Sequence, residues 1–166
     1  MPQNLEIKCA HRSLAGATAV AHRIGATPKG TLRQVDTYFG VRSGRLKLRE
    51  INGKQFELIH YHRTNAKSTR YSHYSIIKLE EPIAAKSVFR SLFGISVVVR
   101  KKRALFLYKN ARIHIDSVER LGTFIEFEVV VNRGKSQARE LMRFLMKEFG
   151  IEQKMLLGGS YSDLIR

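Results

Sequence analysis

The chain has 166 residues, of which 43% are hydrophobic, so it is long enough to bury the core of one domain and too apolar for general disorder. Its 30 Lys and Arg residues against 14 Asp and Glu residues give a net charge of +16, which favours a phosphate-bearing partner: nucleic acid, a nucleotide, polyphosphate or an anionic membrane surface. The sequence lacks an apolar run long enough to cross a membrane, and its one cysteine, Cys9, excludes an internal disulfide and a cysteine-based zinc site.

The predicted elements are mostly strands. In chain order they are strand Leu5–Ala10, helix Ser13–Ile24, strands Gln34–Val41, Arg45–Glu50, Phe56–Arg63 and Tyr71–Leu79, helix Ala84–Phe93, strands Val97–Arg103, Ala104–Tyr108, Arg112–Asp116 and Thr123–Val131, and helix Ser136–Phe149. Each helix has one apolar face and a glycine directly after it, and Asn52-Gly53 predicts a hairpin turn. We expect one α+β domain over residues 1–166, with an antiparallel sheet or barrel and a few helices.

Charged and apolar side chains alternate along five of the predicted strands. The charged members are Glu6 and Lys8; Arg45, Lys47 and Arg49; Lys101 and Arg103; Arg112, His114 and Asp116; and Glu126 and Glu128. Since successive side chains of a strand point to opposite faces, each set lies on one face. An open sheet with its charged face in water would explain the pattern. The helices also need an apolar surface, however, and apolar faces that point outward to meet them would bring the charged faces together inside a barrel.

The mixture of signs on these faces indicates a particular kind of ligand. Several Lys and Arg side chains can clamp the oxygens of a triphosphate group. Carboxylates among them would repel that ligand unless a hard cation such as Mg²⁺ or Mn²⁺ lay between the two. A site for a small triphosphate compound and a divalent metal is therefore favoured over a nucleic-acid site, which needs basic residues alone.

Several segments resemble the CYTH superfamily, the triphosphate tunnel metalloenzymes. These segments are NLEIK near the N-terminus, DTYF at 36–39, LKLRE at 46–50, VRKKR at 99–103, HIDSVERLGTFIEFE at 114–128 and SYSDLI near the end. The resemblance covers nearly the whole chain and implies a closed eight-stranded antiparallel β-barrel, the triphosphate tunnel, with helices packed outside. The superfamily includes class IV adenylyl cyclases, thiamine triphosphatases and inorganic triphosphatases, which use Mg²⁺ or Mn²⁺.

The same resemblance implies roles for individual residues. Those expected to act in catalysis are Lys8, Arg49, Arg103 and Glu126. Those expected to bind the triphosphate are Lys8, Lys47, Arg49, Lys101, Arg103, Arg112 and His114. Those expected to hold the metal are Glu6, Asp116, Glu126 and Glu128.

Two departures from the superfamily pattern bear on these roles. The first glutamate of the N-terminal Glu-x-Glu-x-Lys signature is Asn4 here, which offers a neutral oxygen but no charge, so one metal site is expected to be weaker. In FELIHYHR, Tyr61 stands where many members have a lysine, beside His62 and Arg63, and the pattern does not decide which of them points inward. Tyr161 is expected to pack the C-terminal tail, with capping of the tunnel as the alternative.

We therefore expect a metal-dependent cytoplasmic enzyme that acts on a triphosphate-containing substrate, either by hydrolysis or by cyclisation of ATP with release of pyrophosphate. Two other hypotheses remain: a module that binds polyphosphate or a nucleotide without turnover, and a basic protein that binds nucleic acid on its outer surface. The expected partner is a small triphosphate or a nucleotide, with nucleic acid disfavoured, no membrane partner, and a homodimer as one option for assembly.

Overall fold

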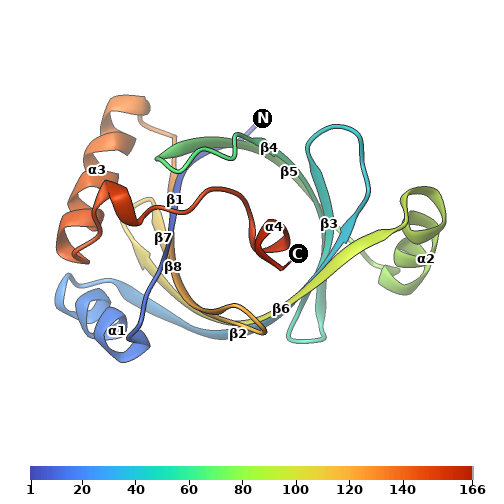
Figure 1. The fold of residues 1–166 in the computed structure, drawn as a ribbon, viewed down its shortest axis with the longest axis horizontal. Coiled ribbons are helices and arrows are strands. Elements are labelled where there is room, and N and C mark those ends of the chain that lie inside the picture. The colour runs from blue at the N-terminus through green and yellow to red at the C-terminus, as the bar shows by residue number, and fades with distance from the viewer. Residues whose placement is uncertain (166) are drawn as a thin grey trace.

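The computed structural model describes residues 1–165, which form a closed antiparallel β-barrel with the strand order β1-β5-β4-β3-β2-β6-β7-β8 (Figure 1). The strands are β1 Gln3–Ala10, β2 Thr27–Phe39, β3 Arg45–Ile51, β4 Gln55–Arg63, β5 Arg70–Lys78, β6 Ile95–Tyr108, β7 Ala111–Val118 and β8 Gly122–Val130. The helices are α1 Leu14–Arg23, α2 Pro82–Phe93, α3 Lys135–Glu148 and α4 Tyr161–Leu164, with a 3₁₀ turn at Gln153–Met155. The predicted eight-stranded antiparallel barrel with helices packed outside is confirmed.

Two strands differ from the sequence prediction by far the most. The predicted strands Val97–Arg103 and Ala104–Tyr108 are one continuous strand, β6. Strand β2 begins at Thr27 rather than at Gln34. The first half of β2 contains a proline and a glycine, which are typical of turns, but it pairs with the second half of β6 across a bulge between Pro28 and Thr31. Pairing between distant segments thus overrides local composition here.

The main hydrophobic core lies outside the barrel. It is formed by apolar side chains of β1, β7 and β8, such as Ile7, Ile113 and Phe127, and by the inner faces of α1 and α3, such as Ala21 and Leu145. Figure 1 shows these two helices on one side of the barrel and α2 on the opposite side. Because the apolar faces point outward to the helices, the alternate side chains must point inward. This arrangement excludes the open-sheet interpretation of the charge pattern.

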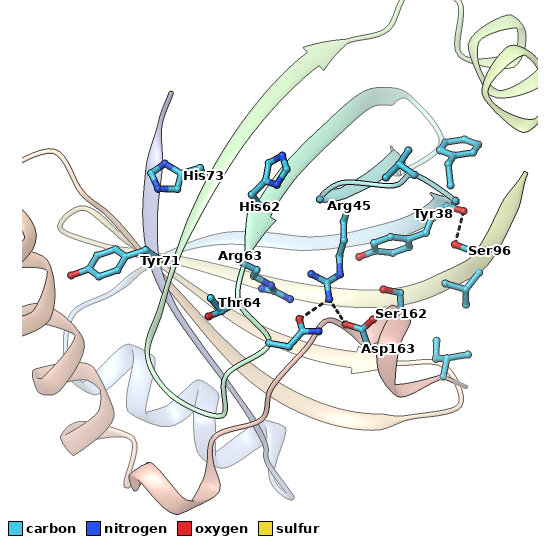
Figure 2. A pocket seen from close by; sticks show the side chains of 17 residues that line it. Tyr38, Arg45, His62, Arg63, Thr64, Tyr71, His73, Ser96, Ser162 and Asp163 are labelled. Carbon is cyan, nitrogen blue, oxygen red and sulfur yellow. Dashed lines mark hydrogen bonds and ion pairs between the residues drawn. The ribbon is translucent and has the colours of Figure 1, made fainter. Parts of the chain in front are cut away.

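The C-terminal segment covers one end of the barrel, where Figure 1 shows it crossing the ring of strands. Its short helix α4 begins with a capping box formed by Ser160 and Asp163. The Arg45 guanidinium of β3 donates to Asp163 Oδ2 at 2.7 Å and to Asn65 Oδ1 at 2.6 Å. Figure 2 shows these contacts on the wall of a surface pocket of about 940 Å³ at this end. The C-terminal segment is thus fixed to the strands at the α4 end and partly covers the barrel there. Among the described residues, no helix is long and apolar enough to span a membrane.

Candidate active site inside the barrel

The barrel encloses a cavity of about 350 Å³ that is lined by side chains from all eight strands and from the C-terminal segment. Lys, Arg and His side chains share this space with carboxylates, and many of them are buried. Buried charges are stable only when they are paired and hydrogen-bonded, so the partners of each charge show how the interior is organised. The contacts divide into four groups.

Asp36 on β2 organises the first group. Its carboxylate accepts two hydrogen bonds from the Arg49 guanidinium, at 2.7 and 2.8 Å, and also lies 2.9 Å from Lys47 Nζ and 3.3 Å from Lys101 Nζ. The side chain is 1% exposed. Burial alone would raise its pKa, but Arg49, Lys101 and Lys47 together hold the pKa of Asp36 well below its ordinary value. One carboxylate therefore gathers three cations from two flanking strands.

Arg103 on β6 forms the second group with Asp116 on β7. Its guanidinium donates two hydrogen bonds of 2.7 Å to Asp116 and a third, of 3.1 Å, to Glu126 Oε1. The Tyr161 hydroxyl of α4 also donates to Asp116, at 2.7 Å. Burial favours a higher pKa for Asp116, but Arg103 outweighs it and the pKa falls to about 2. Asp116 is thus fully engaged by its neighbours.

The third group lies where β7, β8 and β1 meet. Lys8 Nζ is 3.2 Å from Glu126 Oε2, and Arg112 lies 2.8 Å from Glu128 Oε2. Burial lowers the pKa of His114, and the neighbouring Arg103 lowers it further, so the ring is neutral at neutral pH. The His114 Nδ1 atom is 3.1 Å from Glu126 Oε1. The neutral ring donates its Nδ1–H to this carboxylate oxygen and keeps a lone pair on Nε2.

The fourth group links Glu6 to the C-terminal segment. Arg63 donates to Glu6 Oε2 at 2.6 Å and to the carbonyl of Gly159 at 2.8 Å, and Arg70 donates to the same carbonyl at 3.0 Å. Burial raises the pKa of Glu6 despite the neighbouring arginine.

The sequence did not decide which of three residues in FELIHYHR points inward. Tyr61 and Arg63 line the cavity, whereas His62 lines only the surface pocket of Figure 2.

The third group also contains the donor set that best fits a divalent cation. Ligand atoms of His114, Glu126 and Glu128 all lie within 4.8 Å of one another. Asn4 Oδ1, which also faces this cavity, is buried without a hydrogen-bond partner in the described residues. Two carboxylates and a neutral imidazole suit Mn²⁺ or Mg²⁺, and the Asn4 amide oxygen belongs to the lining of the same cavity.

Residues 3–160 of the sequence match the sequence model of the CYTH domain. The chain belongs to the CYTH family. The structure is similar to PH1012 from Pyrococcus horikoshii OT3, with a TM-score of 0.88 and 20% identity over 98% of this chain and 99% of that one. It is also similar to a candidate adenylate cyclase from Vibrio parahaemolyticus, with a TM-score of 0.80 and 16% identity over 98% and 97% of the two chains.

A more distant similarity links this CYTH chain to the RNA triphosphatase Pct1 of Schizosaccharomyces pombe. That structure gives a TM-score of 0.52 and 8% identity over 88% of this chain and 82% of the other. No curated protein matches the sequence. At these identities the solved structures show a shared fold, and the family assignment places the chain among the triphosphate tunnel enzymes.

The structure brings every site residue predicted from the sequence into the barrel interior. The predicted set is Glu6, Lys8, Lys47, Arg49, Lys101, Arg103, Arg112, His114, Asp116, Glu126 and Glu128. Glu6 is paired with Arg63, and Asp116 is held by Arg103 and Tyr161, so neither belongs to the donor set around Glu126 in this structure. The roles of all these residues stay predictions.

The interior also holds residues that were not predicted as part of the site, among them Asp36, Arg63, Arg70 and Tyr161. Asp36 lies in the DTYF segment and shares one face of its strand with Gln34 and Tyr38, which is a weak local signal for an inward position. Arg70 precedes the predicted start of its strand by one residue. Tyr161 combines the two roles considered for it, because it packs the C-terminal tail and also lines the cavity.

The hydroxyl of Tyr161 should contribute measurably to stability. Replacing Tyr161 with Phe removes a hydrogen bond to the buried carboxylate of Asp116 and should lower the free energy of unfolding by about 1–2 kcal/mol. Urea denaturation of the purified variant measures this change. Tyr108→Phe is the matched control, because Tyr108 stacks on Phe144 and its hydroxyl has no partner among the described residues. An equal loss in the two variants would contradict the assigned role.

Proposed function

We propose that this CYTH protein is a divalent-metal-dependent enzyme that cleaves a phosphoanhydride bond of a triphosphate compound. The proposal is supported above all by one observation: cations and carboxylates share one enclosed cavity. A polyanion alone would be repelled by the carboxylates, and a metal alone by the cations. An anion bridged by a metal ion satisfies both sets of charges.

The cations supply binding and charge stabilisation. Lys47, Arg49 and Lys101 are held together by Asp36 and present N–H donors to the cavity, where they would bind the oxygens of the phosphate chain. Lys8 and Arg103 flank Glu126 and would contact the phosphoryl group that reacts. Fixed donors of this kind stabilise the charge that develops in the transition state without reorganisation.

The carboxylates and the imidazole supply the metal ligands. Burial would raise the pKa of Glu126, but Lys8 and Arg103 hold it well below its ordinary value. Burial would also raise the pKa of Glu128, but at the low pH where this carboxyl titrates His114 is protonated, and His114 and Arg112 together bring the pKa of Glu128 to about 2. Both side chains are therefore ionised at neutral pH, which suits metal binding better than proton abstraction. A metal ion held by His114, Glu126 and Glu128 would neutralise phosphate charge and lower the pKa of a bound water.

The experiment is a release assay with inorganic triphosphate, thiamine triphosphate and ATP, each with Mg²⁺, with Mn²⁺ or with EDTA. We expect metal-dependent release that EDTA abolishes. Release of phosphate identifies hydrolysis, in which water is the nucleophile, and release of pyrophosphate with a cyclic nucleotide identifies cyclisation. Tight binding of all three compounds without release at any metal concentration would contradict the proposal and identify a non-catalytic module.

A further inference from the structure

Most of the positive charge of the protein lies outside the cavity. Seven Lys and Arg side chains and four carboxylates line the cavity, out of 30 and 14 in the whole chain. A small triphosphate inside the barrel therefore accounts for only a small part of the net charge of +16. A surplus of this size on the outer surface favours a second, larger polyanion as a partner.

Helix α3, on the flank of the barrel, concentrates part of this charge in one row (Figure 1). Four basic residues follow one another at intervals of four positions, so they form a ridge along the helix. All four are exposed, and none of them forms an ion pair within residues 1–165. The residues of this basic ridge are Lys135, Arg139, Arg143 and Lys147.

The basic ridge is unfavourable in the free protein. Like charges four residues apart on a helix repel each other, and three such pairs occur in succession here. The first turn of α3 contains Lys135 and no acidic residue, although negative charge is favoured at this end of a helix. Of the two carboxylates of α3, Glu148 pairs with Arg23 of α1, which leaves Glu140 to offset the ridge. A bound polyanion would remove the repulsion.

Partly exposed aromatic rings adjoin the basic ridge. Lys135 Nζ lies 4.9 Å from the centre of the Tyr71 ring, and Arg139 donates to the Tyr71 hydroxyl at 3.3 Å. Phe144, next to Arg143 in the chain, is 36% exposed and stacks on Tyr108 with ring centres 5.5 Å apart. Exposed rings beside cations provide surfaces on which unpaired nucleic-acid bases stack.

We propose that the exposed face of α3 binds single-stranded nucleic acid, with phosphates on the basic ridge and a base on Phe144. Successive ridge residues are roughly 6 Å apart along the helix axis, so each can meet a different phosphate of one strand. A duplex keeps its bases stacked inside and would leave the ring unused. An anionic membrane fits less well, because the apolar face of α3, with Leu141 and Leu145, is buried against the barrel and cannot enter lipid.

The test measures binding and is independent of turnover. Fluorescence anisotropy follows labelled uridylate and thymidylate 12-mers with 5′-hydroxyl ends, and their comparison shows whether the ribose 2′-hydroxyl contributes. We expect log K to fall with log salt concentration with a slope of about −2 to −3, as for three or four phosphate contacts on a single strand. Saturating inorganic triphosphate at constant ionic strength should not displace the strand.

Three results of this titration would overturn the proposal. Displacement by inorganic triphosphate would place the strand in the cavity. Absence of binding to both 12-mers would exclude single-stranded nucleic acid as the partner. Binding to vesicles that contain anionic lipid, without binding to either 12-mer, would identify a membrane surface as the partner of α3 instead.

Paired substitutions locate the phosphate contacts. Arg143→Gln/Lys147→Gln should weaken binding of the 12-mer about tenfold and make the salt slope shallower by about 1. Lys54→Gln/Arg90→Gln is the control, because it removes the same charge from exposed positions outside α3, and it should change binding by less than about twofold. Equal weakening by the two variants would show a diffuse attraction to the net charge and refute a site on α3.

The stacking contact is tested with a substitution that keeps an apolar side chain. Phe144→Leu should weaken binding of the single strand about fivefold and leave binding of a 12-base-pair duplex unchanged. Phe93→Leu is the matched control, since Phe93 is 41% exposed and stacks on Phe89 of α2, and it should affect neither ligand. Unchanged binding of the single strand by Phe144→Leu, or equal weakening of both ligands, would show that no base stacks there and refute the preference for a single strand.

Discussion

Glu126→Gln should reduce metal-dependent cleavage of the triphosphate by a factor of about 10²–10³. The substitution keeps the size of the side chain but removes its negative charge, and Glu126 lies between Lys8, Arg103 and His114. The amide cannot accept all of these contacts and also ligate a cation as a carboxylate does. Steady-state rates over a range of Mg²⁺ or Mn²⁺ concentrations measure the effect, and the metal concentration for half-maximal rate should rise.

The control for this variant is Glu119→Gln, which removes the same charge from an exposed turn after β7. Its rate should equal that of the wild-type protein. Circular dichroism and thermal unfolding establish whether Glu126→Gln is folded, since a buried glutamine beside two cations also costs stability. A folded variant with a rate within tenfold of the wild-type value and an unchanged metal dependence would refute the role of Glu126.

The parts of the site that could be predicted from the sequence depend on local alternation. Lys47 and Arg49, or Lys101 and Arg103, are two residues apart on one strand, so they share a face wherever that strand lies. The direction of that face followed from the helices, because α1 and α3 require an apolar surface and therefore leave the charged faces for the interior. The eight-stranded closure itself was implied by the resemblance to the CYTH superfamily.

The parts that could not be predicted depend on contacts between distant segments. Asp36 is a single acid in its strand, and it gathers three cations only because β3 and β6 lie on either side of β2. Likewise, Arg63 and Arg70 meet at the carbonyl of Gly159, about 90 residues further along the chain. Backbone carbonyls carry no sequence signal, so such an anchor for the C-terminal segment becomes visible only in the folded chain.

Asp36→Asn should lower the free energy of unfolding by about 3–5 kcal/mol at neutral pH. The substitution leaves Lys47, Arg49 and Lys101 in a buried position without their shared counter-charge, and Asp36 itself is 1% exposed, so water does not replace it. Urea denaturation measures the loss. Glu148→Gln is the control: it removes one side of the exposed ion pair with Arg23 and should change stability by less than about 1 kcal/mol.

The pH dependence of stability gives this prediction a second readout. The pKa of Asp36 in the folded protein is well below its ordinary value, because Arg49, Lys101 and Lys47 outweigh the effect of burial. The contribution of Asp36 is therefore fully present above the pKa of an unfolded aspartate, about 4, and is lost as the pH falls towards the lower folded value. Between pH 6 and pH 2 the wild-type protein should consequently lose more stability than Asp36→Asn. Parallel acid profiles for the two proteins would show that Asp36 does not hold the three cations in place, and the positioning of Lys47, Arg49 and Lys101 would then require another cause.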